Sequence, residues 1–225
     1  IGEGEEMMLE FLELLEKAKK ENKSRQEFLE EAAKIEGIYV PSLYQVSYNE
    51  DGTIASVNAT NGAPQRVNKR VVSDLDNIFY PDKFVVPFVE VVHDRVVHEI
   101  FRGCIRGCRF CQAGFIYRPV REKSYEVVNR QAKCLCESTG YDEISLSSLS
   151  TSDYRELEPL LNNMLEWTEQ NHISLALPSL RIDNFSESLL EKISKVRKSG
   201  LTFAPEAGTQ RLRDVINKNI TEQNV

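Results

Sequence analysis

Apolar residues in the first part of the chain recur about every 3.6 positions, the period of an amphipathic helix. From Met7 to Ala18 this spacing predicts one helix. Ser24 and Glu27 then have the spacing of a capping box, in which a hydroxyl and a carboxylate satisfy the first free backbone amides of a helix. They predict a second helix that begins after Ser24, and Gly37 is expected to end it.

The period changes to two over residues 38–60, where apolar and polar residues alternate on both sides of Asp51-Gly52. An Asp-Gly pair between two alternating segments is typical of a β-hairpin. Residues 61–90 carry three prolines and no clear period. This segment is expected to form an extended strap between domains, and its apolar side chains indicate that it packs against a neighbour.

Short apolar runs and amphipathic segments alternate beyond residue 92. Strands are predicted at residues 96–101, 144–149, 173–177 and 201–204. Helices are predicted at residues 124–137, 154–170, 186–198 and 209–217. Repeated strand–helix units imply an α/β fold with a parallel sheet and helical crossovers. The chain has no run of about 18 apolar residues, so no membrane span is expected.

Three of the five cysteines, Cys104, Cys108 and Cys111, stand in a C-x3-C-x2-C motif directly after the first of these strands. A 4Fe-4S cluster in an electron carrier takes four thiolates. With three, one iron lacks a protein ligand and can bind a substrate, which favours a catalytic site over an electron relay. Cys134 and Cys136 lie two positions apart on the predicted helix and are expected to be ordinary thiols.

The net charge of −7 argues against bulk electrostatic binding of nucleic acid. Basic residues nevertheless surround the cysteines: Arg102, Arg106, Arg109, Arg118, Arg121 and Lys123. Two interpretations are open, a solvated loop and a positive rim for an anionic substrate or cluster. The acidic start has no secretory signal, so crowded cysteines predict a metal site in a reducing cytoplasm rather than disulfides.

Polar residues also stand at or just beyond the ends of the later predicted strands. They are Ser147, Ser148, Ser179, Arg181 and Glu206. Because the carboxyl ends of parallel strands share one edge of a sheet, these side chains are expected to meet the cysteine loop at one mouth.

The cysteine spacing, the aromatic Phe110 before the last cysteine and the place after a first strand resemble the radical S-adenosylmethionine (SAM) superfamily. Residues 92–124, 179–185 and 201–218 resemble one bacterial group within it, whose members carry a B12-binding-like N-terminal domain. Members are often encoded beside, or fused to, a domain of unknown function.

The resemblance implies a partial TIM-type (βα)6 barrel, truncated here after about four strands. Residues 93–225 would be this incomplete core, and residues 38–92 the hairpin and linker. Residues 1–37 would be the tail of a Rossmann-like, cobalamin-binding-type domain, because the start Ile-Gly-Glu-Gly-Glu looks like its last strand-to-helix turn. Cobalamin would then be held by a preceding segment, and the chain is expected to begin inside a longer protein.

The resemblance also implies the chemistry. The three cysteines would bind a 4Fe-4S cluster, and SAM would chelate the fourth iron through its amino and carboxylate groups. One electron, from a reductant such as flavodoxin or ferredoxin, would cleave SAM to methionine and a 5′-deoxyadenosyl radical. That radical would act on an unknown substrate, while the protein orients the cofactor and excludes water.

By the same resemblance, the pair Ser147–Ser148 would face the SAM amino group, although many members have Gly-Gly-Glu there. Arg181 would pair with the SAM carboxylate, since a guanidinium fork suits a planar anion. Ser179 would bond a ribose hydroxyl, Glu206 the ribose or the amino group, and Phe110 would pack beside the cluster. Structural roles stay open for each: helix caps for the serines, a salt bridge for Arg181, a turn for Glu206.

Two alternatives remain at this point. The first is a zinc-stabilised nucleic-acid-binding module that uses the arginine-rich loop. Zinc would take a fourth Cys or His, but His93, His98 and His172 are expected to have packing, surface or turn roles. The second is a tRNA-modifying, methylthiolation-like radical SAM enzyme, for which the basic rim would suit RNA.

Overall fold

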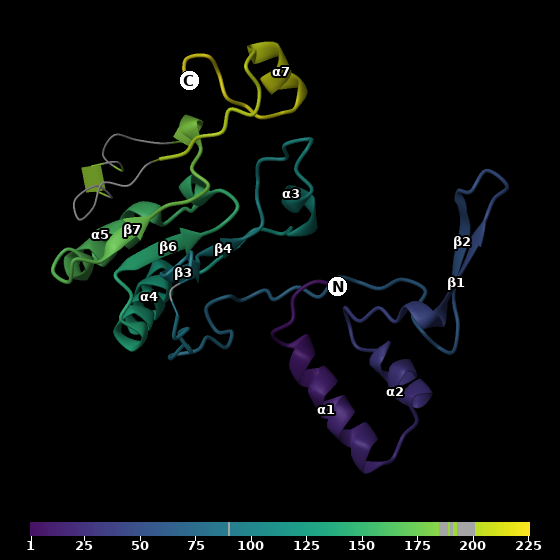
Figure 1. Ribbon diagram of the computed structural model, residues 1–225. Helices are drawn as coiled ribbons and strands as arrows, with labels where there is room; N and C mark the ends of the chain where they lie inside the picture. The colour runs from purple at the N-terminus through teal and green to yellow at the C-terminus, as the bar shows by residue number, and fades with distance from the viewer. Residues whose placement is uncertain (90, 185–188, 190, 193–200) are drawn as a thin grey trace. The chain divides into compact units, whose positions relative to one another are not determined.

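The computed structural model describes residues 1–89, 91–184, 189, 191–192 and 201–225. The chain divides into two compact units, Ile1–Ser73 and Asp74–Val225 (Figure 1). The helix expected at residues 186–198 lies almost wholly outside the described residues. The three domain ranges expected from the sequence stay predictions.

The first unit begins with two packed helices, α1 (Met7–Lys20) and α2 (Arg25–Ala32). Phe11 and Phe28 join them edge to face, with ring centroids 5.5 Å apart. The capping box is confirmed: the Ser24 hydroxyl accepts the Glu27 amide, and the Glu27 side chain accepts the Ser24 amide. The prediction that this helix ends at Gly37 is wrong. The helix ends at Ala32, and the residues after it form separate turns with hydrogen bonds between positions i and i+3.

The predicted hairpin is confirmed as β1 (Tyr44–Tyr48) paired antiparallel with β2 (Ile54–Ala59), after the short 3-10 helix η1 (Pro41–Leu43). The strap that follows is extended, and its described residues form no helix and no strand up to β3.

One isolated bridge joins Gly2 to Arg70. Gly2 has φ +99°, and a Cβ there would lie 2.2 Å from the Arg70 carbonyl oxygen. This close backbone approach gives a local reason for the glycine at the start of the chain.

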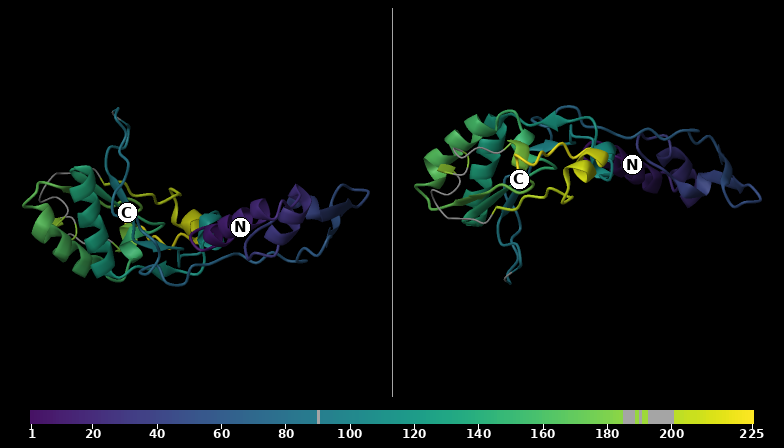
Figure 2. Two further views of the ribbon diagram at one scale, coloured as in Figure 1. Left: turned by 90° about the horizontal axis from the view of Figure 1, so that it is seen from below. Right: turned by 90° about the horizontal axis from the view of Figure 1, so that it is seen from above.

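The second unit contains a parallel sheet of three strands in the order β3 (Val96–Glu99), β6 (Glu143–Ser147), β7 (Ser174–Ala176). Helices α4 (Tyr125–Thr139) and α5 (Leu157–Thr168) connect these strands and lie side by side (Figure 2). The α/β class and the parallel sheet expected from the sequence are therefore confirmed. Right-handed crossovers between neighbouring strands place both helices on one face.

The core lies between this face and the two helices. Val128 and Leu135 of α4, Ile144 of β6, and Leu160 and Met164 of α5 are all at most 1% exposed. Each such side chain contributes roughly 1.5–3 kcal/mol by leaving water. Their periodicity in the sequence matches these buried faces, which explains why these elements were predictable.

The strand expected at residues 201–204 is wrong: these described residues form no strand. Leu201 and Phe203 nevertheless pack against the core. The alternation of apolar and polar residues here therefore reflects burial of these two side chains, without the backbone hydrogen bonds of a strand. Strand β7 spans only three residues and offers little backbone for pairing. Helix α7 (Gln210–Val215) is confirmed, with Thr209 as its N-cap.

The strand expected at residues 96–101 is interrupted at Ile100. Beyond it, β4 (Phe101–Arg102) leaves the sheet and pairs antiparallel with β5 (Arg121–Glu122). The Ile100 amide donates to the Ser147 carbonyl of β6 at 3.1 Å, and its carbonyl accepts the Lys123 amide at 3.0 Å. A β4–β5 ribbon therefore closes the cysteine-containing loop, residues 103–120. Among the described residues, no helix is long and apolar enough to cross a membrane.

Candidate cysteine-loop site

The loop begins at the buried Gly103, which has φ +90°. A Cβ at this position would lie 2.8 Å from the Tyr117 carbonyl oxygen and 2.9 Å from the Pro119 carbonyl oxygen. The two ends of the loop therefore pass each other at a distance that only glycine permits. The short helix α3 (Ala113–Ile116) lies in the second half of the loop.

All three motif cysteines are free thiols in this loop. Cys108 is buried, Cys104 and Cys111 are half-buried, and the Cys111 amide donates to the Cys108 carbonyl at 3.1 Å. Among the described residues, no three Cys, His, Asp or Glu side chains stand close enough together to hold a metal ion. By chemistry the donor set fits an iron–sulfur cluster, since thiolates on one tight turn are its usual ligands.

The other two cysteines lie outside this loop, on α4, as expected. Burial, with a smaller effect of Glu137, raises the pKa of the Cys136 thiol to about 12, so it stays protonated. The Cys134 Sγ donates to the Asp82 carbonyl at 3.4 Å. Both behave as ordinary thiols in helix packing.

Arg106, between the first two motif cysteines, ties the loop to the sheet. Its guanidinium donates to both Asp153 carboxylate oxygens, from Nε at 2.7 Å and from Nη2, and its Nη1 donates to Asp183 Oδ2 at 3.3 Å. Burial works to raise the pKa of Asp153, but hydrogen bonds from Arg106 and Ser150 outweigh it and hold that pKa below its usual range. The hydrogen bond to Asp153 raises the pKa of Arg106 in turn.

Asp153 ends the 3-10 helix η2 (Thr151–Asp153) after β6, and Asp183 lies in the 3-10 helix η3 (Ile182–Asn184) after β7. Arg181 is buried and donates to Asp183 from Nε at 2.9 Å and from Nη2 at 3.0 Å. Arg106, Asp153, Asp183 and Arg181 therefore form one connected set of charges, here called the ionic network.

The network reaches the last part of the described chain. Arg181 Nη2 also donates to the Lys218 carbonyl at 2.7 Å, and the Lys218 Nζ donates to Glu206 Oε1 at 3.2 Å. Glu206 has φ +67° in a turn. Arg181 and Glu206 are thus linked to the cysteine loop through Asp183 and Lys218, and their roles toward SAM stay predictions.

Two of the three predicted serines contact Thr151. The hydroxyls of Ser148 and Thr151 are 2.9 Å apart, and the Thr151 amide donates to the Ser179 carbonyl at 3.2 Å. Ser179 is exposed with φ +59°, whereas Ser147 is half-buried at the end of β6. Phe110 is 53% exposed. The structure brings Ser148 and Ser179 together at Thr151 and leaves Phe110 about half exposed.

A second set of contacts links the loop to the end of α7. The Arg109 amide donates to the Ile216 carbonyl at 2.9 Å, and its guanidinium donates to the Val215 carbonyl. Asn217 Nδ2 donates to the Gly107 carbonyl at 2.9 Å. The middle of the cysteine motif is therefore clamped to residues more than one hundred positions away.

These contacts change the interpretation of the basic cluster. Arg106 and Arg109 are held as described above, Arg102 Nε donates to Glu99 at 2.9 Å, and Arg121 is buried and donates to the Pro119 carbonyl. Lys123 is buried with its Nζ 4.5 Å from the centre of the Tyr80 ring. All five side chains contact partners within the protein and hold the local fold. The solvated-loop interpretation is wrong for the four that are buried or half-buried, whereas Arg109 is exposed, and the interpretation as a positive rim stays a prediction.

The histidines have the structural roles expected. His98 is buried, and the Tyr80 hydroxyl lies 2.6 Å from its Nδ1. Burial, with a smaller effect of Lys123, lowers the pKa of His98 to about 3, so the ring is neutral. His93 is exposed beside Arg95, and His172 is exposed in the turn before β7.

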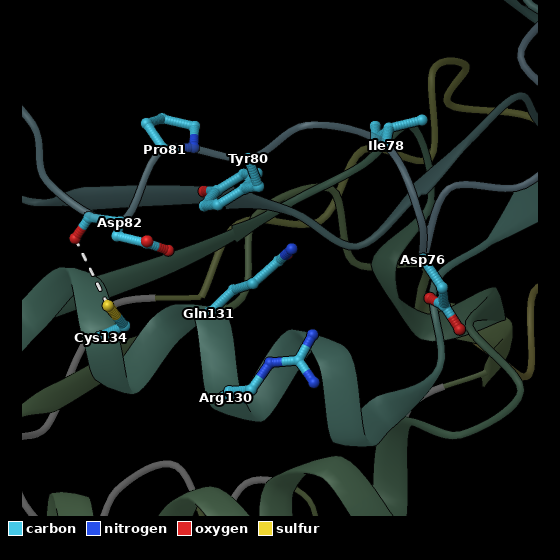
Figure 3. A pocket seen from close by; sticks show the side chains of 8 residues that line it. All are labelled: Asp76, Ile78, Tyr80, Pro81, Asp82, Arg130, Gln131 and Cys134. Atoms are coloured by element: carbon cyan, nitrogen blue, oxygen red, sulfur yellow. Dashed lines mark hydrogen bonds between the residues drawn. The ribbon is translucent and has the colours of Figure 1, made fainter.

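A cavity of about 300 Å³ lies between the strap and α4 (Figure 3). Its lining residues are Asp76, Ile78, Tyr80, Pro81, Asp82, Arg130, Gln131 and Cys134. None of them is a predicted site residue. This cavity is therefore a different place from the mouth expected at the carboxyl ends of the strands.

Asp153, Asp183 and Asn217 contact the loop but were not predicted from the sequence. One signal was present for the two acids: Ser-Leu occurs after both β6 and β7, and an aspartate follows it by three or four positions. Ser148 precedes Asp153 in this pattern, and Ser179 precedes Asp183. For Asn217 the sequence held no comparable signal.

An α/β fold with a three-cysteine loop at the carboxyl end of its first strand defines a class of cofactor-dependent enzyme domains. Residues 98–225 match the sequence profile of the Radical SAM superfamily, and residues 1–41 match that described as Radical SAM proteins, N-terminal. The chain belongs to the radical SAM superfamily and is an enzyme of that class.

Two archaeal proteins of Methanocaldococcus jannaschii are similar to part of the chain. The uncharacterized protein MJ0966 is 32% identical over 127 residues, which cover 56% of this chain and 27% of that protein. The putative methylthiotransferase MJ0865 is 26% identical over 137 residues, which cover 56% of this chain and 30% of that protein. The chain thus spans less than a third of either relative.

Proposed function

We propose that Cys104, Cys108 and Cys111 bind a 4Fe-4S cluster and that the protein cleaves SAM reductively to act on a further substrate. The observation that carries this proposal is the cysteine loop itself. It is closed by the β4–β5 ribbon, follows the carboxyl end of β3 in a parallel sheet and is tied to the segments after β6 and β7. Family membership supports both the cluster and SAM as cofactors.

The cluster, when bound, would supply one electron to SAM and so release methionine and a 5′-deoxyadenosyl radical. The role of the protein in this step would be to hold the reactants and to exclude water. In this proposal Ser147 and Ser148 face the SAM amino group, and Ser179 bonds a ribose hydroxyl. In this proposal the SAM carboxylate takes the place of Asp183 on the Arg181 guanidinium, since both are planar anions that suit the same fork.

The test is anaerobic reconstitution with iron and sulfide, followed by reduction in the presence of SAM and assay for 5′-deoxyadenosine. We expect a brown protein and a nucleoside product. Cys104→Ala should lose the cluster, whereas the matched control Cys134→Ala should keep it. An intact cluster that gives no 5′-deoxyadenosine with SAM would sink the proposal. A colourless protein that holds zinc would favour the nucleic-acid-binding alternative.

A methylthiolation-like reaction, with tRNA as a substrate, is the second candidate. It is supported by the similarity to the putative methylthiotransferase from M. jannaschii over 137 residues. The basic side chains of the loop give it less support than the sequence suggested, because most of them are held by partners of the chain. Incubation of the reconstituted protein with SAM and bulk tRNA, followed by mass spectrometry of nucleosides, separates the two candidates.

The membership in the B12-binding-like group rests on the resemblance of the sequence segments named above. The match of residues 1–41 concerns the N-terminal part of radical SAM proteins and names no cofactor. Cobalamin is therefore not part of the proposed reaction. A flavodoxin or ferredoxin as reductant, and a cytoplasmic location, belong to the proposal because the cluster needs a low-potential electron donor and reduced thiols.

A further inference from the structure

Arg106 stands inside the cysteine motif, yet its side chain turns to the sheet. Only 22% of the side chain is exposed, and all three of its guanidinium nitrogens donate to carboxylates. A bidentate arginine–carboxylate pair fixes both distance and orientation, which a single point charge cannot do. The geometry therefore restrains the backbone between Cys104 and Cys108 in direction as well as in position.

The two carboxylates that receive Arg106 are themselves fixed. Ser150 Oγ donates to Asp153 Oδ2 at 2.6 Å, and the Asp153 side chain is 7% exposed. Asp183 is held by two hydrogen bonds from the buried Arg181. Since these acids follow β6 and β7, the anchor points belong to two neighbouring strands of the sheet.

We propose that Arg106 is a positioning residue, which sets the cysteine loop against the carboxyl ends of β6 and β7 before any cofactor binds. This proposal rests on the proposed function, in which the loop binds the cluster. Asp183 is shared between Arg106 and Arg181, so one carboxylate links the loop to the side chain proposed to receive the SAM carboxylate. In the absence of SAM, a change at Asp183 is therefore expected to affect both contacts.

The first experiment measures amide hydrogen exchange in the metal-free protein, with peptides that cover the loop. The Arg109 and Cys111 amides are direct reporters, because each donates to a named carbonyl in this structure. Arg106→Lys, which keeps the charge and loses the fork, should speed exchange of the loop about tenfold or more. Peptides from α4 and β6 should be unchanged, and Arg211→Lys, at an exposed position of α7, should match the wild type.

Asp153→Asn is the second variant and keeps the shape of the side chain. If Arg106 and Asp153 act as a pair, the double variant should exchange no faster than the faster single variant. Additive effects of the two variants would contradict the pair. If Arg106→Lys speeds exchange throughout the second unit, the variant is generally destabilised. The proposal is then tested with Asp153→Asn, by comparing exchange of the loop with exchange of α4 and β6. Loop exchange within twofold of the wild type in both variants would overturn the proposal.

The second experiment gives a readout that general stability would not move. After reconstitution with iron and sulfide and reduction, the electron paramagnetic resonance spectrum reports the geometry around the cluster. Arg106→Lys should broaden or split the wild-type signal, and Arg211→Lys should reproduce it. A wild-type protein that assembles no cluster but shows the expected exchange pattern would overturn the proposed function and support the positioning of the loop by Arg106.

Discussion

Gly103 gives the sharpest test of how the cysteine loop is closed. With φ +90° and two carbonyl oxygens within 2.9 Å of the Cβ position, Gly103→Ala meets two separate penalties. The positive φ costs about 1–2 kcal/mol for a residue with a Cβ. The added Cβ would also press against the Tyr117 and Pro119 carbonyls, which lie in the second half of the same loop. Overpacking of this kind costs about 1–3 kcal/mol more.

Gly140 is the matched control for this change. It has φ +76° after α4, and no atom lies within 4 Å of a Cβ placed there. Gly140→Ala therefore carries the backbone penalty alone. Urea unfolding of the two variants should place Gly103→Ala below Gly140→Ala in free energy of unfolding by about 1–3 kcal/mol.

The loop itself is the second readout of the same pair of variants. Gly103→Ala should raise hydrogen exchange in residues 103–120, whereas Gly140→Ala should leave that segment unchanged. If the two variants lose equal stability, and the loop exchanges alike in both, then the ends of the loop do not pass each other as described. The ribbon of β4 and β5 would then not be the element that closes it.

Three further predictions follow from buried groups. Because the pKa of His98 falls from 6.5 to about 3 on folding, its contribution to stability is complete above pH 6.5 and is lost as pH falls toward 3. His98→Gln should flatten the acid side of a stability–pH curve, measured by urea unfolding, and His172→Asn should not. Leu160→Ala, at a fully buried position of α5, should cost about 2–5 kcal/mol in the same assay. In native protein, maleimide labelling followed by mass spectrometry should find Cys136 far slower than Cys134, and equal rates would contradict the burial of Cys136.

The sequence predicted those parts of the fold that depend on near neighbours. Ser24 and Thr209 mark helix starts because a cap acts across three residues. The buried faces of α4 and α5 follow from apolar periodicity alone. The break at Ile100 was not predictable in this way, because the six apolar-rich residues around it fit one strand as well as two. Only pairing with residues 121–122 separates the alternatives.

In the site, too, features set by neighbouring residues were predictable, whereas contacts between residues far apart in the sequence were not. The cysteine spacing and the strand before it located the loop, since both are local features. One partner of Arg106, Asp153, lies 47 positions away, and the partner of Gly107 lies 110 positions away. Charge pairs of this kind depend on how the strand ends meet in space. For that reason the sequence left a solvated loop and a positive rim open as interpretations and did not indicate the contacts that hold these side chains.

The β4–β5 ribbon has a consequence for how such a domain can vary. Phe101 faces Glu122 and Arg102 faces Arg121, so the chain leaves and rejoins the domain at almost one point. A segment with adjacent ends can be lengthened, shortened or exchanged for another without moving the strands that carry it. Residues 103–120 are such a segment, so the loop can differ in length or sequence between related domains while β4 and β5 hold its two ends in place.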